Sequence, residues 1–261
     1  MMKISLIKVL SIALLFISGI LISFTTFSQT TSLKPYLDSL ISSDNDLIII
    51  RNLEKVITYY DTTDRAKAIP YLRQAIEQYQ KQDSLLSEAN SLSQLAEIYS
   101  FYNEFDSVIS IAEKAIEVYY MIEHKAEAIP TMSLIGRAYN SKTDFPKALE
   151  KHREILDFYI NQPPEFPNKE RRIAAQEIHI ALAMHEMGYY EIATDYIISA
   201  LNKIESNKEW GNVLKCFAIK IMGMISLKIG DYESAMKNFK EIEQIHAETN
   251  DKRLPSKNKI S

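Results

Sequence analysis

The chain has 261 residues and a mass of 30.0 kDa, of which 46% are hydrophobic and 25% charged, so it can bury one or two cores. Its 6 glycines fall well below the usual share of about 7%, which argues against turn-rich β-sandwiches and glycine-loop nucleotide folds and favours helices. A net charge of −4 and a pI of about 5.8 argue against a nucleic-acid-binding surface.

The first 28 residues have the pattern of a secretory signal peptide. Lys3 and Lys8 form a short basic region, and residues 9–24 are apolar, a stretch shorter than the roughly 20 residues that cross a bilayer as a helix. Small polar residues precede a predicted cut before Gln29. We therefore expect 1–28 to be removed and the remaining chain to be extracytoplasmic, either periplasmic or secreted. An uncleaved anchor in the inner membrane is the alternative, and it also leaves the chain outside the cytoplasm.

A pattern of small and apolar residues then recurs five times. Each instance has a small residue, a second residue four positions on and a third seven positions on, and these positions share one face of a helix. An insertion with three prolines, residues 162–168, explains the one longer interval, because such a segment forms a stiff loop. The instances begin at Ala68, Val108, Ala148, Ala193 and Ala235, which are 40, 40, 45 and 42 residues apart.

Another apolar stripe precedes each of the last four instances and predicts a first helix for each unit. This stripe contains a small residue that lets the neighbouring helix approach closely, at Ala96, Gly136, Ala181 and Gly223. Three of the four turns between the two predicted helices carry Gly, which suits a left-handed backbone, or Asp, which suits a helix cap. The four turns lie at 103–105, 143–145, 188–190 and 230–232.

These residues resemble the tetratricopeptide repeat (TPR) family. The match is best at Gly223, Gly230, Asp231, Tyr232, Ala235 and Phe239. The period looks like the long-repeat variety found in extracytoplasmic regions of bacterial sensor and regulator proteins. The resemblance covers roughly residues 46 to 249 and implies an all-α fold, a right-handed superhelical α-solenoid of about five helix-turn-helix repeats. We assign residues 33–249 to this repeat domain and 250–261 to a polar tail.

The resemblance also implies a concave groove lined by outward positions of each first helix. Some family members hold a peptide carboxylate there with Lys and Asn side chains, but Glu97 and Arg137 occupy two of the Asn positions here, so we expect no clamp of that kind. Carried over to this sequence, the candidate binding residues are Glu97, Phe101, Arg137, Asn140, His185 and Lys220.

Catalytic and metal-binding patterns are weak in this sequence. His185-Glu186 begins like the zinc motif H-E-x-x-H but lacks the second His, and His179 lies six residues from His185, on a different helix face. The sequence contains no glycine-rich phosphate loop and no nucleophile motif. We therefore expect no catalytic residue, no metal and no cofactor.

The first helix of the fifth unit is apolar almost all round, as a helix with neighbours on every side should be. No sixth pair follows it in this sequence. We therefore predict an exposed apolar patch at Phe217, Ile221 and Met224, covered by a partner, by a second copy of the chain or by sequence missing from it.

Two functions are compatible with these observations. The first is a non-catalytic, extracytoplasmic scaffold that binds a protein or peptide in the groove, with self-association through the C-terminal repeat as a further possibility. The alternative is a signal-input domain, stand-alone or truncated, of a bacterial histidine kinase or transcription regulator. Neither function requires nucleic acid, and neither involves a membrane beyond the signal segment.

Overall fold

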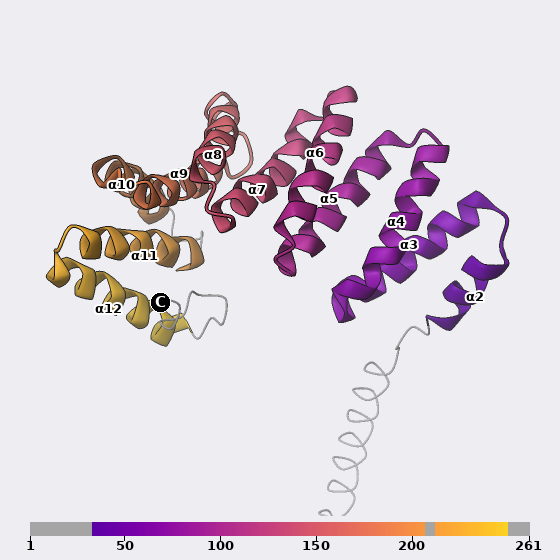
Figure 1. Ribbon diagram of the computed structural model, residues 1–261, viewed down its shortest axis with the longest axis horizontal. Helices are drawn as coiled ribbons and strands as arrows, with labels where there is room; N and C mark the ends of the chain where they lie inside the picture. Colours follow the sequence, from indigo (N-terminus) through magenta and orange to yellow (C-terminus); the bar gives the residue numbers. More distant parts are fainter. Residues whose placement is uncertain (1–32, 207–211, 250–261) are drawn as a thin grey trace, which may run out of the picture. The chain divides into compact units, whose positions relative to one another are not determined.

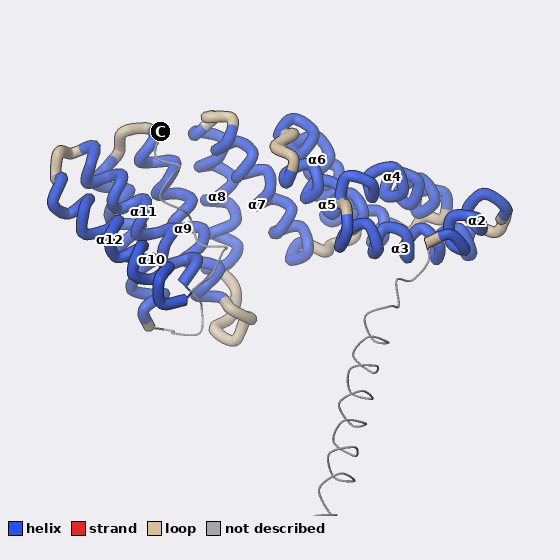
Figure 2. The backbone as a smooth tube through the Cα atoms, turned by 90° about the horizontal axis from the view of Figure 1, so that it is seen from below, coloured by secondary structure: helices blue, strands red, loops and turns tan. Residues whose placement is uncertain are grey.

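The computed structural model describes residues 33–206 and 212–249, so the predicted signal peptide (1–28) and polar tail (250–261) lie outside the described residues. All regular secondary structure in these two ranges is helical, which confirms the all-α prediction (Figures 1 and 2). No helix in the described ranges is both long enough and apolar enough to cross a membrane. The helices are α2 (Lys34–Ser42), α3 (Asp46–Thr63), α4 (Arg65–Lys81), α5 (Leu85–Phe101), α6 (Phe105–Met121), α7 (Lys125–Ser141), α8 (Phe145–Ile160), α9 (Lys169–Glu186), α10 (Tyr190–Glu205), α11 (Asn212–Lys228) and α12 (Tyr232–Thr249).

The chain divides into two compact units, residues 1–71 and residues 72–261. In the first unit, α2 packs against α3, and Asn52 on α3 donates a hydrogen bond to the hydroxyl of Ser39 on α2 over 2.8 Å. Asn45 caps α3 by accepting hydrogen bonds from two backbone N–H groups of its first turn. The short α2 is thereby fixed to the longer helix that follows it.

In the second unit, each helix from α5 to α12 packs on the helix that follows it in the chain, as the neighbouring ribbons of Figure 1 show. Contacts also join α5 to α7 and α9 to α11, so the first helices of these neighbouring pairs contact each other. A helix pair of this kind cannot bury its apolar stripe alone, and stacking of successive pairs produces one continuous core. Polar side chains on these first helices are therefore brought side by side.

The predicted anchor faces form the core of these pairs. In the repeat whose anchor begins at Ala148, the anchor residues Ala148, His152 and Ile155 are all fully buried. In the repeat that begins at Ala235 burial is weaker, because Phe239 is only partly buried on α12, the last described helix. The anchor residues that are buried are Ala68, Leu72, Ala75, Val108, Ala112, Ala115, Ala148, His152, Ile155, Ala193, Ile197, Ala200, Ala235 and Ile242, which confirms that the anchor faces read from the sequence are core faces.

The turns at 103–105, 143–145, 188–190 and 230–232 share one backbone geometry. Gly188 and Gly230 have φ values of +84° and +82°, which confirms that these glycines supply the left-handed conformation. Thr143 occupies the corresponding position of another turn with φ +60°. In each case the next backbone N–H donates to a carbonyl of the preceding helix, as Asp144 does to Tyr139 over 3.0 Å. These bonds close the helix ends and fix how each pair turns.

Two of the predicted small residues allow close approach of the helices in a pair. A Cβ atom added to Gly136 on α7 would lie 2.7 Å from the ring of His152 on α8. One added to Gly223 on α11 would lie 2.9 Å from the ring of Phe239 on α12. A glycine at these positions therefore makes room for the ring that faces it.

The prediction of an exposed apolar patch on α11 is wrong. Ile221 is fully buried, and Phe217 and Met224 are partly buried. The physical reason is that α11 packs against three helices, α9, α10 and α12, which together cover most of its surface. The exposed side of α12 carries polar residues, among them Lys237 and Lys240.

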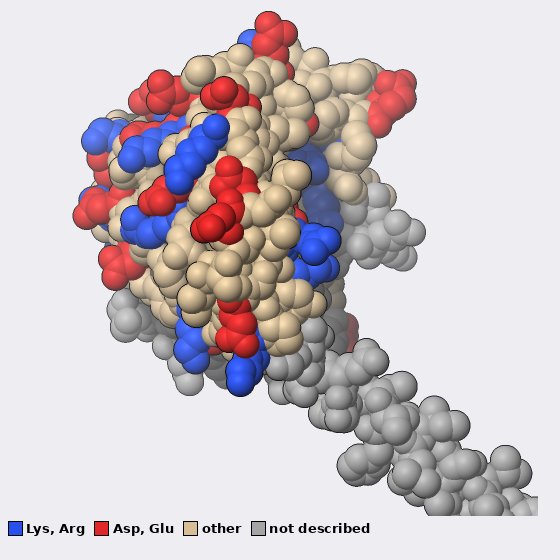
Figure 3. Space-filling view, turned by 90° about the vertical axis from the view of Figure 1, so that its right-hand side faces the viewer, with Lys and Arg blue, Asp and Glu red and all other residues tan. Residues whose placement is uncertain are grey.

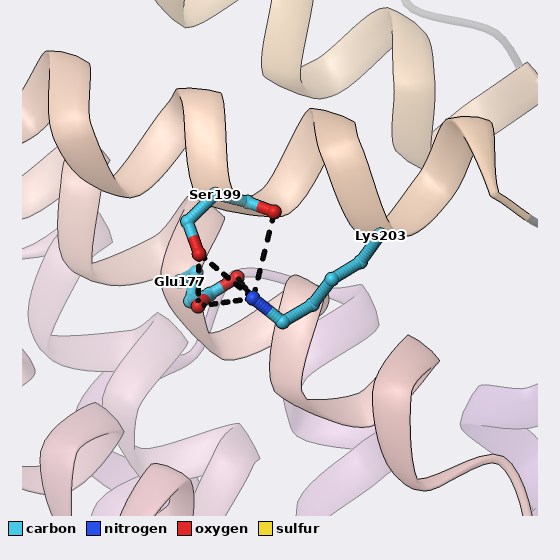
Figure 4. A network of polar contacts seen from close by, with 3 residues as sticks. All are labelled: Glu177, Ser199 and Lys203. Carbon is cyan, nitrogen blue, oxygen red and sulfur yellow. Dashed lines mark hydrogen bonds and ion pairs between the residues drawn. The ribbon is translucent and has the colours of Figure 1, made fainter.

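A buried polar network joins α9 to α10 (Figure 4). Glu177 on α9 is 7% exposed, and its two carboxylate oxygens lie 2.8 and 3.1 Å from the Nζ atom of Lys203 on α10. The hydroxyl of Ser199 donates to the same carboxylate over 2.8 Å, and it accepts a hydrogen bond from Lys203. Every charge in this network is paired, as burial requires.

Candidate functional site

A hollow of about 320 Å³ lies on the layer of first helices in the second unit. Helices α5, α7 and α9 supply most of its lining, and α8 adds one tyrosine. We call it the α5–α7–α9 hollow. It is lined by Ser93, Glu97, Ile129, Pro130, Ser133, Leu134, Arg137, Tyr159, Arg172 and Gln176.

The charges of the hollow are unequal, because two guanidinium groups, of Arg137 and Arg172, face a single carboxylate, that of Glu97. Desolvation by the surrounding protein lowers the pKa of Arg137, and the charge of Glu97 opposes this effect. Arginine remains protonated in proteins, so the hollow carries one net positive charge. Within the described residues, neither arginine forms an ion pair. Elsewhere, on the face drawn in Figure 3, acidic and basic side chains are interspersed.

Arg172 is held in place by aromatic side chains. Its Nη1 atom donates to the hydroxyl of Tyr159 over 3.0 Å, and its guanidinium lies 5.5 Å from the centre of the Tyr159 ring and 5.8 Å from that of Phe166. Phe166 belongs to the proline-rich loop before α9. Lys169 fixes this loop by donating hydrogen bonds to the backbone carbonyls of Ile160 and Gln162, where the loop begins. The Nε atom of Arg172 is buried and has no hydrogen-bond partner among the residues that the structure describes. The group is therefore positioned but incompletely satisfied.

A second polar layer lies beneath the hollow. The Nδ1 atom of His152 is 2.9 Å from Gln176 Oε1, and its Nε2 atom is 3.3 Å from Asn140 Nδ2. Because the amide oxygen of Gln176 can only accept, His152 carries its proton on Nδ1 and accepts from Asn140 on Nε2. The ring of His179 stacks on that of His152, with 4.6 Å between ring centres and an interplanar angle of 9°.

Both stacked histidines are neutral at physiological pH. Burial lowers the pKa of His152 to about 4, an effect that the hydrogen bond donated to Gln176 only partly offsets. Burial, together with the charges of the neighbouring His152 and Arg137, lowers the pKa of His179 to about 3. The pair can therefore stack at close range without repulsion.

The candidate residues read from the sequence are only partly brought together. Glu97 and Arg137 line the hollow, and Asn140 lies beneath it in contact with His152. Phe101 ends α5 and is 65% exposed, but it does not line the hollow. Lys220 lies on α11, which contributes no residue to the lining.

The expectation that His185 faces the groove is wrong. Only 3% of its surface is exposed, and its ring centre lies 5.7 Å from that of Tyr190, the first residue of α10. Its Nε2 atom is 3.7 Å from the carboxylate of the adjacent Glu186. His185 is covered because it lies in the last turn of α9, where the chain turns back into α10.

Sequence reasoning missed the contribution of α9 and α8 to the hollow, namely Arg172, Gln176 and Tyr159. Of the candidate residues carried over from the family, only His185 lies on α9, at the opposite end of that helix. One signal was available: Arg172 and Gln176 are polar residues four positions apart at the start of a largely apolar helix, so they share a face.

The described residues contain no group of three or more His, Cys, Asp or Glu side chains that could hold a metal ion. Cys216 is buried, and this burial raises the pKa of its thiol to about 11, which keeps it in the unreactive protonated form. The chemistry available in the hollow is hydrogen bonding and charge pairing.

Comparisons with known proteins agree with this architecture. A model of the soluble NSF attachment protein family matches residues 52–164, and no curated protein matches the sequence. A Podosopora anserina protein with nearly identical TPR-like repeats, of the kinesin light chain type, superposes with a TM-score of 0.60 at 14% identity over 77% of this chain and 96% of that one. The chain has a TPR-like fold.

Three further solved structures share this TPR-like fold. BtubC from P. vanneervenii has a TM-score of 0.64 at 14% identity, over 89% of this chain and 93% of that one. The quorum sensor NprR from B. thuringiensis has a TM-score of 0.66 at 16% identity, over 92% of this chain and 65% of that one. RapI has a TM-score of 0.64 at 17% identity over 79% of this chain, which spans about half of RapI, 55% of its length.

Proposed function

We propose that this protein is a non-catalytic scaffold that binds a segment of a protein or peptide partner in the α5–α7–α9 hollow. The observation that carries the proposal is the pair of arginines, Arg137 and Arg172, held in a hollow of the first-helix layer without an ion-pair partner in the described residues. Guanidinium groups left without partners in a concave site are suited to recognition. The TPR-like fold supports the same role, because stacked helix pairs present extended binding surfaces.

Site-specific photo-crosslinking tests this proposal. A photoreactive amino acid placed at Ser133, which lines the hollow, should capture a partner in the native cells. The control places the same group at Glu113, an exposed residue of α6 outside the hollow. The expected result is a species captured only from Ser133 that also binds the purified chain. Equal capture from both positions, or no capture from Ser133, would contradict the proposal.

We further propose that the scaffold acts outside the cytoplasm, on the basis of the signal-peptide pattern in residues 1–28. Cell fractionation combined with N-terminal sequencing of the purified protein tests this location. A chain that begins at Gln29 in the extracytoplasmic fraction is the expected result. A chain that keeps its first residues and sediments with membranes would support the anchored alternative, and a cytoplasmic chain would contradict both.

A signal-input module is the second candidate function. It is favoured by the shared fold with NprR, which is named a quorum sensor. The crosslinking experiment separates the two candidates by the mass of the adduct. A small diffusible peptide on Ser133 would support signal input, whereas a resident protein would support the scaffold.

A further inference from the structure

We infer that the α5–α7–α9 hollow binds one carboxylate group of its partner, between the guanidinium groups of Arg137 and Arg172. This inference rests on the proposed function and specifies the chemistry of the bound group. The geometry differs from the Lys and Asn clamp known in the family, because Glu97 and Arg137 occupy two of the Asn positions and Arg172 enters from the start of α9.

The hydrogen-bond inventory of the hollow favours an anion. Arg137 is exposed to solvent and has no carboxylate partner within ion-pair distance in the described residues. Arg172 donates from Nη1 to Tyr159, and its buried Nε atom has no partner in the described part of the chain. A fixed guanidinium with unused donors is suited to a carboxylate, whose two oxygens match two parallel N–H groups.

Two neutral groups extend the set of donors. Gln176 is 6% exposed and lines the hollow, and its amide oxygen is already engaged by His152, so its amide nitrogen is the atom left for a ligand. Tyr159 is 4% exposed and accepts a hydrogen bond from Arg172, which leaves its own hydroxyl proton free to donate. Both side chains are held by packing before any ligand binds, which reduces the cost of ordering them.

The charge balance favours a single carboxylate over a phosphate. With two guanidinium groups and the carboxylate of Glu97, the hollow is neutralised by one negative charge. A phosphate ester carries close to two negative charges at neutral pH and would be repelled by Glu97. The carboxylate can come from an Asp or Glu side chain or from the C-terminus of a peptide.

Peptide binding by the purified chain tests the inference and separates these two sources. The probes are an array of short synthetic peptides, each made with an internal Glu or the matched Gln, and with a free or an amidated C-terminus. Binding is expected to weaken by about tenfold or more when the recognised carboxylate becomes an amide. Loss on Glu→Gln replacement identifies a side chain, and loss on amidation identifies the C-terminus.

Variants of the chain place the effect in the hollow. Arg137→Gln and Arg172→Gln should each abolish the preference for acid over amide, and Arg153→Gln, at an exposed arginine of α8 outside the hollow, is the matched control. Glu97→Gln should tighten binding of the acidic peptides. Because Arg172 packs on two aromatic rings, its replacement can also disturb folding. Arg172→Lys, which keeps the positive charge, and a measurement of the thermal stability of each variant distinguish a lost contact with the peptide from a folding defect.

The outcomes separate the inference from the proposed function. Peptides that crosslink to Ser133 but bind equally as acid and amide would overturn the carboxylate inference and leave the scaffold proposal intact. Tighter binding of phosphoserine peptides than of their Glu counterparts would also overturn it. An array on which the wild-type chain retains no peptide would contradict both.

Discussion

At the scale of single residues, the turns show where side-chain chemistry and backbone conformation disagree. Thr143 has φ +60°, although its β-branched side chain makes this left-handed conformation costly. Asn103 occupies the corresponding position of the preceding pair with the same φ, and asparagine tolerates the conformation better. The fold therefore stores strain at Thr143 that the repeat pattern does not require.

Replacing Thr143 by Asn should relieve this strain. We expect Thr143→Asn to raise the free energy of unfolding by about 1 kcal/mol, measured by urea denaturation. Gly188→Ala provides the reverse test, because a Cβ atom there meets nothing within 4 Å and only the backbone conformation opposes it. That variant should lose about 1 kcal/mol. A less stable Thr143→Asn variant would show that the threonine is not strained.

At the scale of elements, the contact of α9 with α10 depends on the network around Glu177. Removing one partner of a buried ion pair costs more than the pair contributes, because the other charge remains buried without compensation. Lys203→Met leaves the Glu177 carboxylate, whose side chain is 10% exposed, with Ser199 alone. The contact between α9 and α10 is therefore more sensitive to the loss of one charged partner than to the loss of both.

We expect Lys203→Met to lower the free energy of unfolding by about 3 kcal/mol, and the double variant Glu177→Leu/Lys203→Met to recover most of that loss. The matched control is Lys151→Met, which breaks a half-exposed pair with Glu154 on α8 and should cost under about 1 kcal/mol. Chemical denaturation of the wild type and these three variants measures each free energy of unfolding. Equal losses at Lys203 and Lys151 would mean that the buried pair has no special role.

The sequence predicts the elements much better than it predicts the hollow. The anchor spacing identifies buried faces because helix packing repeats at three and four residues, and Gly188 and Gly230 reveal turns because few residues accept their backbone conformation. The contribution of Arg172 is not visible in the same way, since it depends on how the loop before α9 directs the start of that helix. The expected patch at Ile221 fails for a related reason: the apolar pattern indicates neighbours on every side of α11 but does not reveal that α9, α10 and α12 already supply them.

At the scale of the whole molecule, the stacked histidines connect protonation to the stability of the second unit. His152 on α8 contacts Asn140 on α7 and Gln176 on α9, and His179 on α9 lies 5.7 Å from Phe217 on α11, measured between ring centres. Four helices therefore meet around two neutral imidazole rings. A proton on either ring would place a charge in this packed layer, beside the positive charge of Arg137.

Stability should consequently fall as the pH is lowered. The pKa values of His152 and His179, about 4 and about 3 when folded, lie below the usual 6.5, so the unfolded chain binds protons that the folded chain excludes. Their stabilising effect is fully present above about pH 6.5 and is lost progressively as the pH falls toward the folded values. At about pH 5 the expected loss is about 2 kcal/mol for His152 and less for the partly exposed His179.

Thermal unfolding measured across this pH range, for the wild type and two variants, assigns the effect. His179→Phe keeps a ring in the stack, and the Nδ1 atom that it removes has no hydrogen-bond partner within the described residues. Because phenylalanine binds no proton, the melting temperature of this variant should fall less steeply with pH than that of the wild type. His124→Asn, at a half-exposed histidine outside the stacked pair, is the matched control. A His179→Phe variant with the wild-type slope would show that this ring does not link proton binding to folding.

The stacked histidines also connect protonation to the α5–α7–α9 hollow, because Gln176 bonds to His152 and lines the hollow. Acid conditions that unstack the rings should therefore weaken peptide binding before the chain unfolds.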